Sequence, residues 1–288
     1  MKPTWPPVAI MAVTLLLGCG SSQAAHNSTR ASPSAAAALS GVTAATSPSS
    51  RASARPASAA HPSAGAGAAR QTAAAPPAPG QVNEPRLGKY LYDLSGTHQA
   101  PGAPASQPYP SGTTLTVNVQ SKTATATGDE FAAETTTSQD PGVFEDSRVR
   151  WEMSRIALYH TEISFTGLAD YNCDYTPPLE LLPIPVRSGA LPAQQWSSSS
   201  CSGTAQITVV DQEPVTAAGV TWPTWKITSH VTYQYHSGTS TLSGSLDETT
   251  WFAPGLGESV KSDTTGSSTL NGQAASTHQV TVLRSYPA

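Results

Sequence analysis

The chain has 288 residues, a formal net charge of −4 at pH 7, only 12% charged residues and three cysteines. Its length allows one or two domains, although the composition of the first third removes that region from any packed core. No cluster of Lys and Arg is present that could neutralise phosphates, which excludes nucleic acid as the expected partner.

The N-terminus carries a short apolar run behind one basic residue. Lys2 supplies the positive charge, and residues 8–17 are apolar. This run of roughly ten residues is too short for a membrane-spanning helix, which needs about 20. It ends in Leu16-Leu17-Gly18-Cys19, which resembles the lipobox of bacterial lipoprotein signal peptides. The alternatives are an ordinary secretory signal cut elsewhere and an N-terminal core strand.

The resemblance implies that residues 1–18 are a signal peptide and that Cys19 becomes a lipidated N-terminus. Cys19 would then carry a diacylglyceryl group, and acyl chains such as palmitate would bind the lipid membrane. Two acyl chains anchor a protein stably, whereas one does not. The expected location is therefore extracytoplasmic, at the cell membrane.

Residues 19–84 are dominated by Ala, Ser, Pro, Gly and Thr and contain no Phe, Tyr or Trp. Such a segment cannot bury enough apolar surface to offset its conformational entropy. Its frequent prolines also interrupt the Ala-rich runs that could otherwise form helices. We expect a disordered tether with an r.m.s. reach on the order of 45 Å.

Residues 85–288 alternate apolar and polar side chains between Gly, Pro and Ser clusters, which predicts antiparallel strands. The expected class is all-β, with a half-barrel or sandwich-like sheet. Tyr90, Tyr92 and Leu94 predict a first strand near a turn at Gly96, and residues 115–119 predict a second. The threonines that follow Phe131 predict an exposed edge strand.

Residues 149–163 predict a hairpin that turns at Ser154-Arg155. In that register Met153 faces Ile156, Trp151 faces Leu158, and Arg150 lies beside Tyr159 in a cation–π contact.

Cys173 and Cys201 remain as each other's only partners if Cys19 is lipidated. A disulfide between them would contribute about 3–4 kcal/mol. A redox or metal pair is the weaker alternative, because the chain has no C-x-x-C and no His at ligand spacing. Residues 177–185 contain four prolines and predict an extended crossover that cannot be a central strand. It could be a polyproline ligand or a buried crossing whose leucines cap the core.

Residues 225–235 form the clearest predicted strand, with apolar side chains on one face and polar side chains on the other. The apolar face holds Trp225, Ile227, Val231, Tyr233 and Tyr235. A turn at 236–239 leads to a strand that carries Leu242 and Leu246.

The order V-R-W, C-D-Y-T-P-P, L-P-I-P and T-T-W-F-A-P-G-L-G resembles a family of uncharacterised exported proteins and lipoproteins of high-GC bacteria. The resemblance covers about residues 140–265. It implies a sheet related to the half-barrels of lipoprotein carriers, closed by the strand that ends in W-F-A-P-G-L-G. It implies no catalytic residue, and Ser259 departs from the aliphatic residue expected after Glu258.

No local catalytic signature is present: the chain lacks G-x-S-x-G, S-x-x-K, H-E-x-x-H and a P-loop. Ser259 and Lys261 predict an exposed polar pair. His230 and His236 share a strand face about 20 Å apart and cannot hold one metal together. His160 and Glu162 lie about 7 Å apart and could join Asp170 or Asp174 in an acidic cleft.

Large aromatic and aliphatic side chains offer an apolar cavity or, alternatively, a filled core. The candidates are Trp151, Leu158, Trp196, Trp225, Tyr233 and Trp251. The sequence therefore predicts a non-catalytic, membrane-anchored lipoprotein that binds an apolar or lipid ligand, with no metal and no cofactor. The alternatives are a structural or protein-interaction module of the cell envelope and, third, a hydrolase with an unrecognised site. Protein partners are not predicted.

Overall fold

The computed structural model describes residues 80–139, 142–165 and 170–288. The predicted signal peptide, Cys19 and the tether up to residue 79 lie outside these residues. No helix in the described ranges is long and apolar enough to span a membrane. The predicted all-β antiparallel fold is confirmed. The strands are β1 Gly88–Gln99, β2 Gln107–Pro108, β3 Thr114–Ala124, β4 Gly128–Thr137, β5 Val143–Glu152, β6 Arg155–Phe165, β7 Tyr171–Pro183, β8 Gly189–Ala190, β9 Gln194–Ser197, β10 Cys201–Ala217, β11 Val220–Ser237, β12 Ser240–Ala253, β13 Glu258–Leu270 and β14 Gln273–Ser285.

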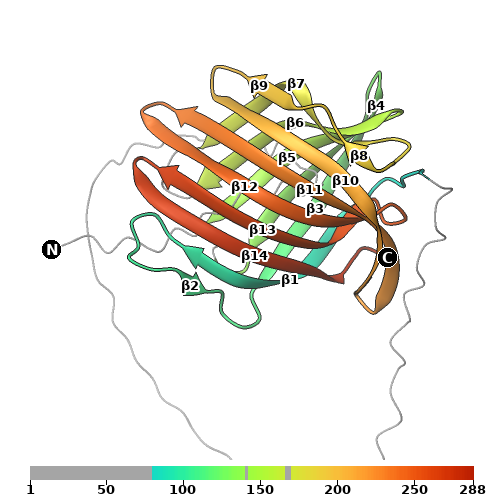
Figure 1. The fold of residues 1–288 in the computed structure, drawn as a ribbon, viewed down its shortest axis with the longest axis horizontal. Coiled ribbons are helices and arrows are strands. Elements are labelled where there is room, and N and C mark those ends of the chain that lie inside the picture. Colours follow the sequence, from blue (N-terminus) through green and yellow to red (C-terminus); the bar gives the residue numbers. More distant parts are fainter. Residues whose placement is uncertain (1–79, 140–141, 166–169) are drawn as a thin grey trace, which may run out of the picture. The chain divides into compact units, whose positions relative to one another are not determined.

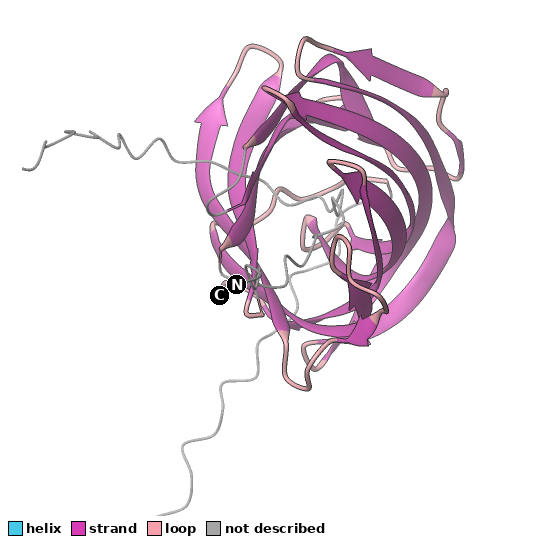
Figure 2. Ribbon diagram, turned by 90° about the vertical axis from the view of Figure 1, so that its left-hand side faces the viewer, coloured by secondary structure: helices cyan, strands magenta, loops and turns pink. Residues whose placement is uncertain are grey.

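These strands form one sheet in the order β7-β6-β5-β4-β3-β1-β14-β13-β12-β11-β10-β8. Most neighbours in the sheet are neighbours in the chain, joined by short turns. The exception is β1, which pairs with β3 on one side and with the C-terminal strand β14 on the other. The sheet curls into a nearly closed barrel shape, so that β3 to β6 face β11 to β13 across the interior (Figures 1 and 2).

The interior is set by the alternation of side chains along each strand. In β5, for example, Val143, Glu145, Ser147, Val149 and Trp151 are buried, while the alternate residues are half-buried on the outer face. Buried side chains from nearly all the long strands join one continuous hydrophobic cluster. Burial of this inner face provides the main stabilisation of the fold.

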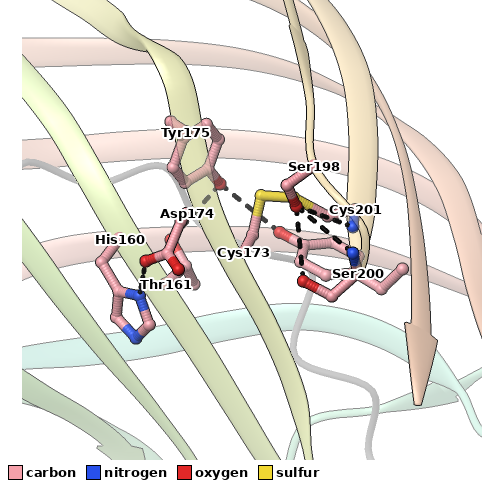
Figure 3. Close-up of a disulfide and its surroundings, with 9 residues drawn as sticks. His160, Thr161, Cys173, Asp174, Tyr175, Ser198, Ser200 and Cys201 are labelled. Carbon is pink, nitrogen blue, oxygen red and sulfur yellow. Dashed lines mark hydrogen bonds and ion pairs between the residues drawn. A yellow bond between two sulfur atoms is a disulfide. The ribbon is translucent and has the colours of Figure 1, made fainter. Parts of the chain in front are cut away.

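The two edges of the curled sheet meet at a seam between β7 and β10. The predicted disulfide is confirmed: Cys173 of β7 is bonded to Cys201 of β10, with 5.3 Å between their Cα atoms (Figure 3). Further along β7, the Gln194 side chain of β9 forms hydrogen bonds with the β7 backbone, as a neighbouring strand would. Its Oε1 accepts from the Glu180 backbone N–H at 2.7 Å, and its Nε2 donates to the Glu180 carbonyl at 2.8 Å. A covalent bond, one side-chain amide and the packing of Tyr175 against Trp196 therefore hold the seam.

Residues 80–87 precede β1 and lie against the sheet. The Asn83 backbone N–H donates to the Pro254 carbonyl at 2.8 Å, and Gly80 accepts from Val186 at 2.9 Å. Glu84 pairs with Lys122 of β3 at 2.5 Å. The last five residues of the predicted tether, 80–84, are thus part of the folded unit.

Two predicted strand features are wrong. Gly96 lies inside β1, with φ of 113°, and not in a turn. Only glycine fits there, because a Cβ would collide with the His278 carbonyl of β14. The threonine-rich strand β4 is not an edge, since it pairs with both β3 and β5. Its Thr135 and Thr137 are buried, so the polarity of this strand reflects a partly polar interior.

The hairpin of β5 and β6 is confirmed, but its turn lies one residue earlier than predicted. Trp151 faces Ile156, and Val149 faces Leu158. Met153 therefore lies in the turn and is 93% exposed. The predicted cation–π contact is present nevertheless, with the Arg150 guanidinium 3.8 Å from the centre of the Tyr159 ring.

Residues 177–183 of the segment with four prolines form the end of the edge strand β7, which agrees with its exclusion from the sheet centre. Its Leu179, Leu181 and Leu182 are buried. By contrast, the strand ending in W-F-A-P-G-L-G does not close the sheet, because β12 lies between β11 and β13. The edges are instead contributed by β7 and by the short strands beside β10.

Candidate functional site in the sheet interior

Five of the six predicted cavity or core residues are buried members of the hydrophobic cluster: Trp151, Leu158, Trp196, Tyr233 and Trp251. Trp225 is half-buried and packs against this cluster. Trp151 meets Phe131 edge-on at 5.1 Å, and Trp196 meets Tyr175 at 5.2 Å between ring centres. The structure therefore distributes these side chains instead of gathering them at one point. Trp251 lies on the opposite face of β12 from Leu246 and Glu248, with Lys261 Nζ 4.2 Å from the centre of its ring.

A small hollow lies beside Tyr233 and Leu246, where β13 and β14 approach each other. Its volume is about 10 Å³, which is room for about one water molecule, and the rest of its lining comes from Gly266, Ser267, Ser268, Ser276 and Thr277. Sites for drug-sized ligands commonly measure about 300–1,000 Å³. An acyl chain bound here would have to extend beyond this hollow.

Two glutamates occupy inward positions that the alternation pattern assigns to the core. Glu145 shares the inner face of β5 with Val143 and Val149 and is 7% exposed. Glu248 shares the inner face of β12 with Leu246 and is 6% exposed. Strands β5 and β12 are not neighbours in the sheet. The curl of the sheet is what brings the two carboxyls within electrostatic range of each other.

Hydroxyl groups bind one of these carboxyls and occupy other buried positions of the interior. Thr264 of β13 donates to Glu248 Oε1 at 3.3 Å, and Thr250 also forms a hydrogen bond with this carboxyl. On the opposite side, the Tyr175 hydroxyl lies 3.3 Å from Thr161 Oγ1 and 3.4 Å from the Tyr235 hydroxyl. We call Glu145, Glu248, Tyr175, Tyr235 and Thr264 the inner polar cluster.

Burial changes the acidity of this cluster. It raises the pKa of Glu145 to about 8, with smaller contributions from the negative charges of Asp146 and Glu248. Burial also raises the pKa of Glu248 to about 7, against the hydrogen bonds from Thr250 and Thr264. The pKa values of Tyr175 and Tyr235 are raised too, by burial first and then by neighbours that include Glu145.

The two carboxyls differ in their partners. Glu248 is hydrogen-bonded, whereas the Glu145 carboxyl forms no hydrogen bond with any described residue, and the charges that act on it are both acidic. Among the described residues, no Lys or Arg is buried, and His98 is the one buried histidine. The interior thus holds acids without counter-ions, an arrangement that is costly unless the acids are protonated or paired.

A third buried acid, Glu258, lies at the start of β13 and is 1% exposed. Its Oε1 has no hydrogen-bond partner, and the same is true of Ser259 Oγ. Burial raises the pKa of Glu258 well above its usual value, although the Ser259 backbone N–H donates to this carboxyl. The prediction that Ser259 and Lys261 form an exposed pair is therefore wrong for Ser259, which is 1% exposed. A bulge at this point of the β12–β13 pairing changes the alternation.

The predicted acidic cleft lies on the outer face. His160 Nδ1 and Asp174 Oδ1 are 2.7 Å apart (Figure 3), and Glu162 stands opposite Asp146. Asp170 is exposed and forms no hydrogen bond or ion pair with these residues among the described ranges. No group of three metal-ligating side chains is found within the described ranges. His230 and His236 are exposed, and His230 pairs with Asp247 at 2.7 Å.

Neither Glu145 nor Glu248 is among the site residues predicted from the sequence. A signal was available, since each acid interrupts the apolar face of an alternating strand. Their proximity could not be predicted from the sequence, because it depends on the curl of the whole sheet.

No protein-family model matches the chain, and no curated protein matches it. Among solved structures, the chain is similar to a "putative lipoprotein" from Parabacteroides distasonis, with a TM-score of 0.37 and 10% identity over 72% of this chain and 99% of that chain. It is also similar to a "putative exported protein with YmcC-like fold" from Bacteroides fragilis, with a TM-score of 0.28, 10% identity and the same coverage. Neither comes from the high-GC bacteria of the family resemblance. At such low similarity, these structures assign no activity to the chain, and its own residues must do so.

Proposed function

We propose that this chain is an extracytoplasmic lipoprotein, anchored through Cys19, whose sheet domain binds an apolar or lipid ligand without catalysis. The anchor is supported by Leu16-Leu17-Gly18-Cys19 and by the apolar run before it. The observation that carries the binding role is the continuous apolar and aromatic lining of a curled sheet. Polar groups are buried among these apolar side chains, and an apolar lining that also carries polar groups is the usual composition of a ligand site.

The seam supports a route into this interior. Most neighbouring strands are joined by long hydrogen-bonded ladders, but β7 is held to the opposite edge by the Cys173–Cys201 bond and by Gln194. Between these two points, Tyr175 packs against Trp196 with 5.2 Å between ring centres. Separating the edges between these two points breaks few backbone hydrogen bonds. A ligand larger than the hollow beside Tyr233 can then enter with limited loss of structure.

The anchor is tested by labelling growing cells with a palmitate analogue. We expect label on the wild-type protein and none on Cys19→Ser. Label on the variant, or none on either protein, would contradict lipidation at Cys19.

The binding role is tested by native mass spectrometry of the protein extracted from its host membrane. We expect a polypeptide carrying an additional non-covalent apolar mass, released on denaturation. Recovery of bare polypeptide alone would reject the ligand-binding role and favour the structural or protein-interaction module.

Entry through the seam is tested with Gln194→Ala. Gln195→Ala is the matched control, because only the first change removes the seam contact. We expect faster ligand exchange in Gln194→Ala and unchanged exchange in Gln195→Ala.

A further inference from the structure

A purely apolar ligand would form no hydrogen bond or ion pair with the inner polar cluster. Glu145 is more than nine-tenths buried, yet its carboxyl has no hydrogen-bond partner among the described residues. A buried polar group without a partner costs about 1–3 kcal/mol, and more when it is charged. Native structures rarely keep such groups without a reason.

The surroundings of Glu145 define what could pair with it. Asp146 lies next to it on the outer face of β5, Glu248 faces it from β12, and the phenols of Tyr175 and Tyr235 come from β7 and β11. No described Lys or Arg is buried with them. The missing partner is therefore a cation or a strong hydrogen-bond donor, since an anion would be repelled by both carboxyls.

We propose that the interior binds an amphiphile whose primary ammonium head group lies between Glu145 and Glu248, with its apolar chain against the aromatic lining. This inference rests on the proposed ligand-binding function and names the ligand class. An ammonium group has three N–H donors and no acceptor. It can donate to both carboxylates and to one of the two phenol oxygens. Charge-assisted hydrogen bonds of this kind are about twice as strong as neutral ones.

The proposal also explains why two acids are retained inside. Without a ligand, Glu145 is largely protonated at pH 7, because burial raises its pKa to about 8. A bound cation favours the ionised form and lowers this pKa. Binding at neutral pH should therefore release protons, and this readout is independent of affinity.

The test compares three ligands with one ten-carbon chain and different head groups: decylamine, decanol and decanoate. The protein is the mature chain from position 19, carrying Cys19→Ser, and binding is measured by calorimetry at pH 7.0 in two buffers of different ionisation enthalpy. Because hydrogen bonds to charged groups contribute about 1.5–3 kcal/mol, we expect decylamine to bind at least about tenfold more tightly than decanol. Decanoate should bind most weakly, and only decylamine should release protons.

Two variants locate the head group. Glu145→Gln should lose most of the preference for decylamine and the associated proton release, while still binding decanol. Glu248→Gln should weaken the preference in the same direction. The control Glu162→Gln changes an outer carboxyl that faces Asp146 and should keep the wild-type preference. Melting curves of all three variants verify that each is folded.

Equal affinity for the three ligands, or an unchanged decylamine preference in Glu145→Gln, would overturn the inference and leave the ligand-binding role standing. Failure of all three ligands to bind would reject both. Tighter binding of decanol than of decylamine would also overturn the inference, since it would indicate that a protonated Glu145 binds a neutral head group.

Discussion

The inner and outer faces of this sheet carry the same acidic residue types in opposite environments. On the outer face, Glu130 pairs with Arg150 at 2.8 Å, and Asp174 pairs with His160 at 2.7 Å. On the inner face, Glu145 and Glu248 have no basic partner. The cationic side chains of this domain therefore lie beside acids that water already solvates. They do not lie beside the buried acids, where an unpaired carboxylate is costly. Such a placement is expected if the inner acids serve a ligand.

The largest expected difference between the two faces concerns how the stability of the folded state depends on pH. The folded state raises the pKa of Glu145 from its ordinary 4.5 to about 8, so the folded state holds an extra proton between these values. Stability is then fully present below about pH 4.5 and falls as pH rises toward 8. The loss from this one group is about 3–5 kcal/mol.

Replacing Glu145 by Gln should remove this loss, because Gln resembles the protonated acid. Urea unfolding should show similar stability for the two proteins at pH 4.5 and a clearly more stable variant at pH 9. Glu162→Gln on the outer face is the matched control. If wild type and Glu145→Gln follow the same pH curve, the inner carboxyl does not have the environment described.

The next effect concerns the seam that separates the two faces. The double variant Cys173→Ser, Cys201→Ser opens a link between residues 28 positions apart, and the chain-entropy model predicts a loss of about 3–4 kcal/mol. Its urea midpoint should fall accordingly. If water then reaches the interior, the pH dependence due to Glu145 should also shrink. An unchanged midpoint would show that the remaining seam contacts suffice.

Hydrogen-bonded threonines provide a smaller, matched comparison of the faces. Thr264 is buried and donates to Glu248, whereas Thr204 is exposed and lies 2.7 Å from Thr232. Thr264→Val leaves a buried acid less satisfied and should cost about 1–2 kcal/mol. Thr204→Val keeps the β-branched shape on the outer face and should change stability by about 0.5 kcal/mol or less. Equal costs in urea unfolding would remove the distinction between the faces.

The smallest effect is expected among the outer acids. Asp146 stands opposite Glu134 on one side and Glu162 on the other. Partial burial, followed by these two charges, raises its pKa to about 6. Glu162→Gln should lower the Asp146 pKa and stabilise the protein by about 0.2–0.5 kcal/mol at neutral pH. Carboxyl NMR titration measures the first effect, and a rise in the Asp146 pKa would contradict it.

Local sequence patterns predicted what depends on neighbouring residues. Alternation identified the strands at 115–119 and 225–235 and the turn at 236–239, because side-chain direction repeats every two residues. The contact of Arg150 with Tyr159 followed from the hairpin, even though the turn lies one residue earlier than expected. The pairing of Cys173 with Cys201 followed from counting the cysteines.

Features that depend on the whole sheet could not be predicted in this way. The position of β4 within the sheet depends on its partners on both sides, and its threonines suggested an edge because a polar interior was not anticipated. The burial of Ser259 depends on a bulge that changes the alternation at the start of β13. Glu145 and Glu248 meet only because β5 and β12 face each other after the sheet curls.

Glu145 is the uncompensated acid on which the proposed site for a cationic head group depends. The most direct test is a carbon-13 NMR titration of the Glu145 carboxyl in the mature chain, assigned with Glu145→Gln, with and without decylamine. The account predicts a pKa near 8 without ligand and a clear decrease when decylamine is bound. An ordinary glutamate pKa of about 4.3, unchanged by decylamine, would contradict it.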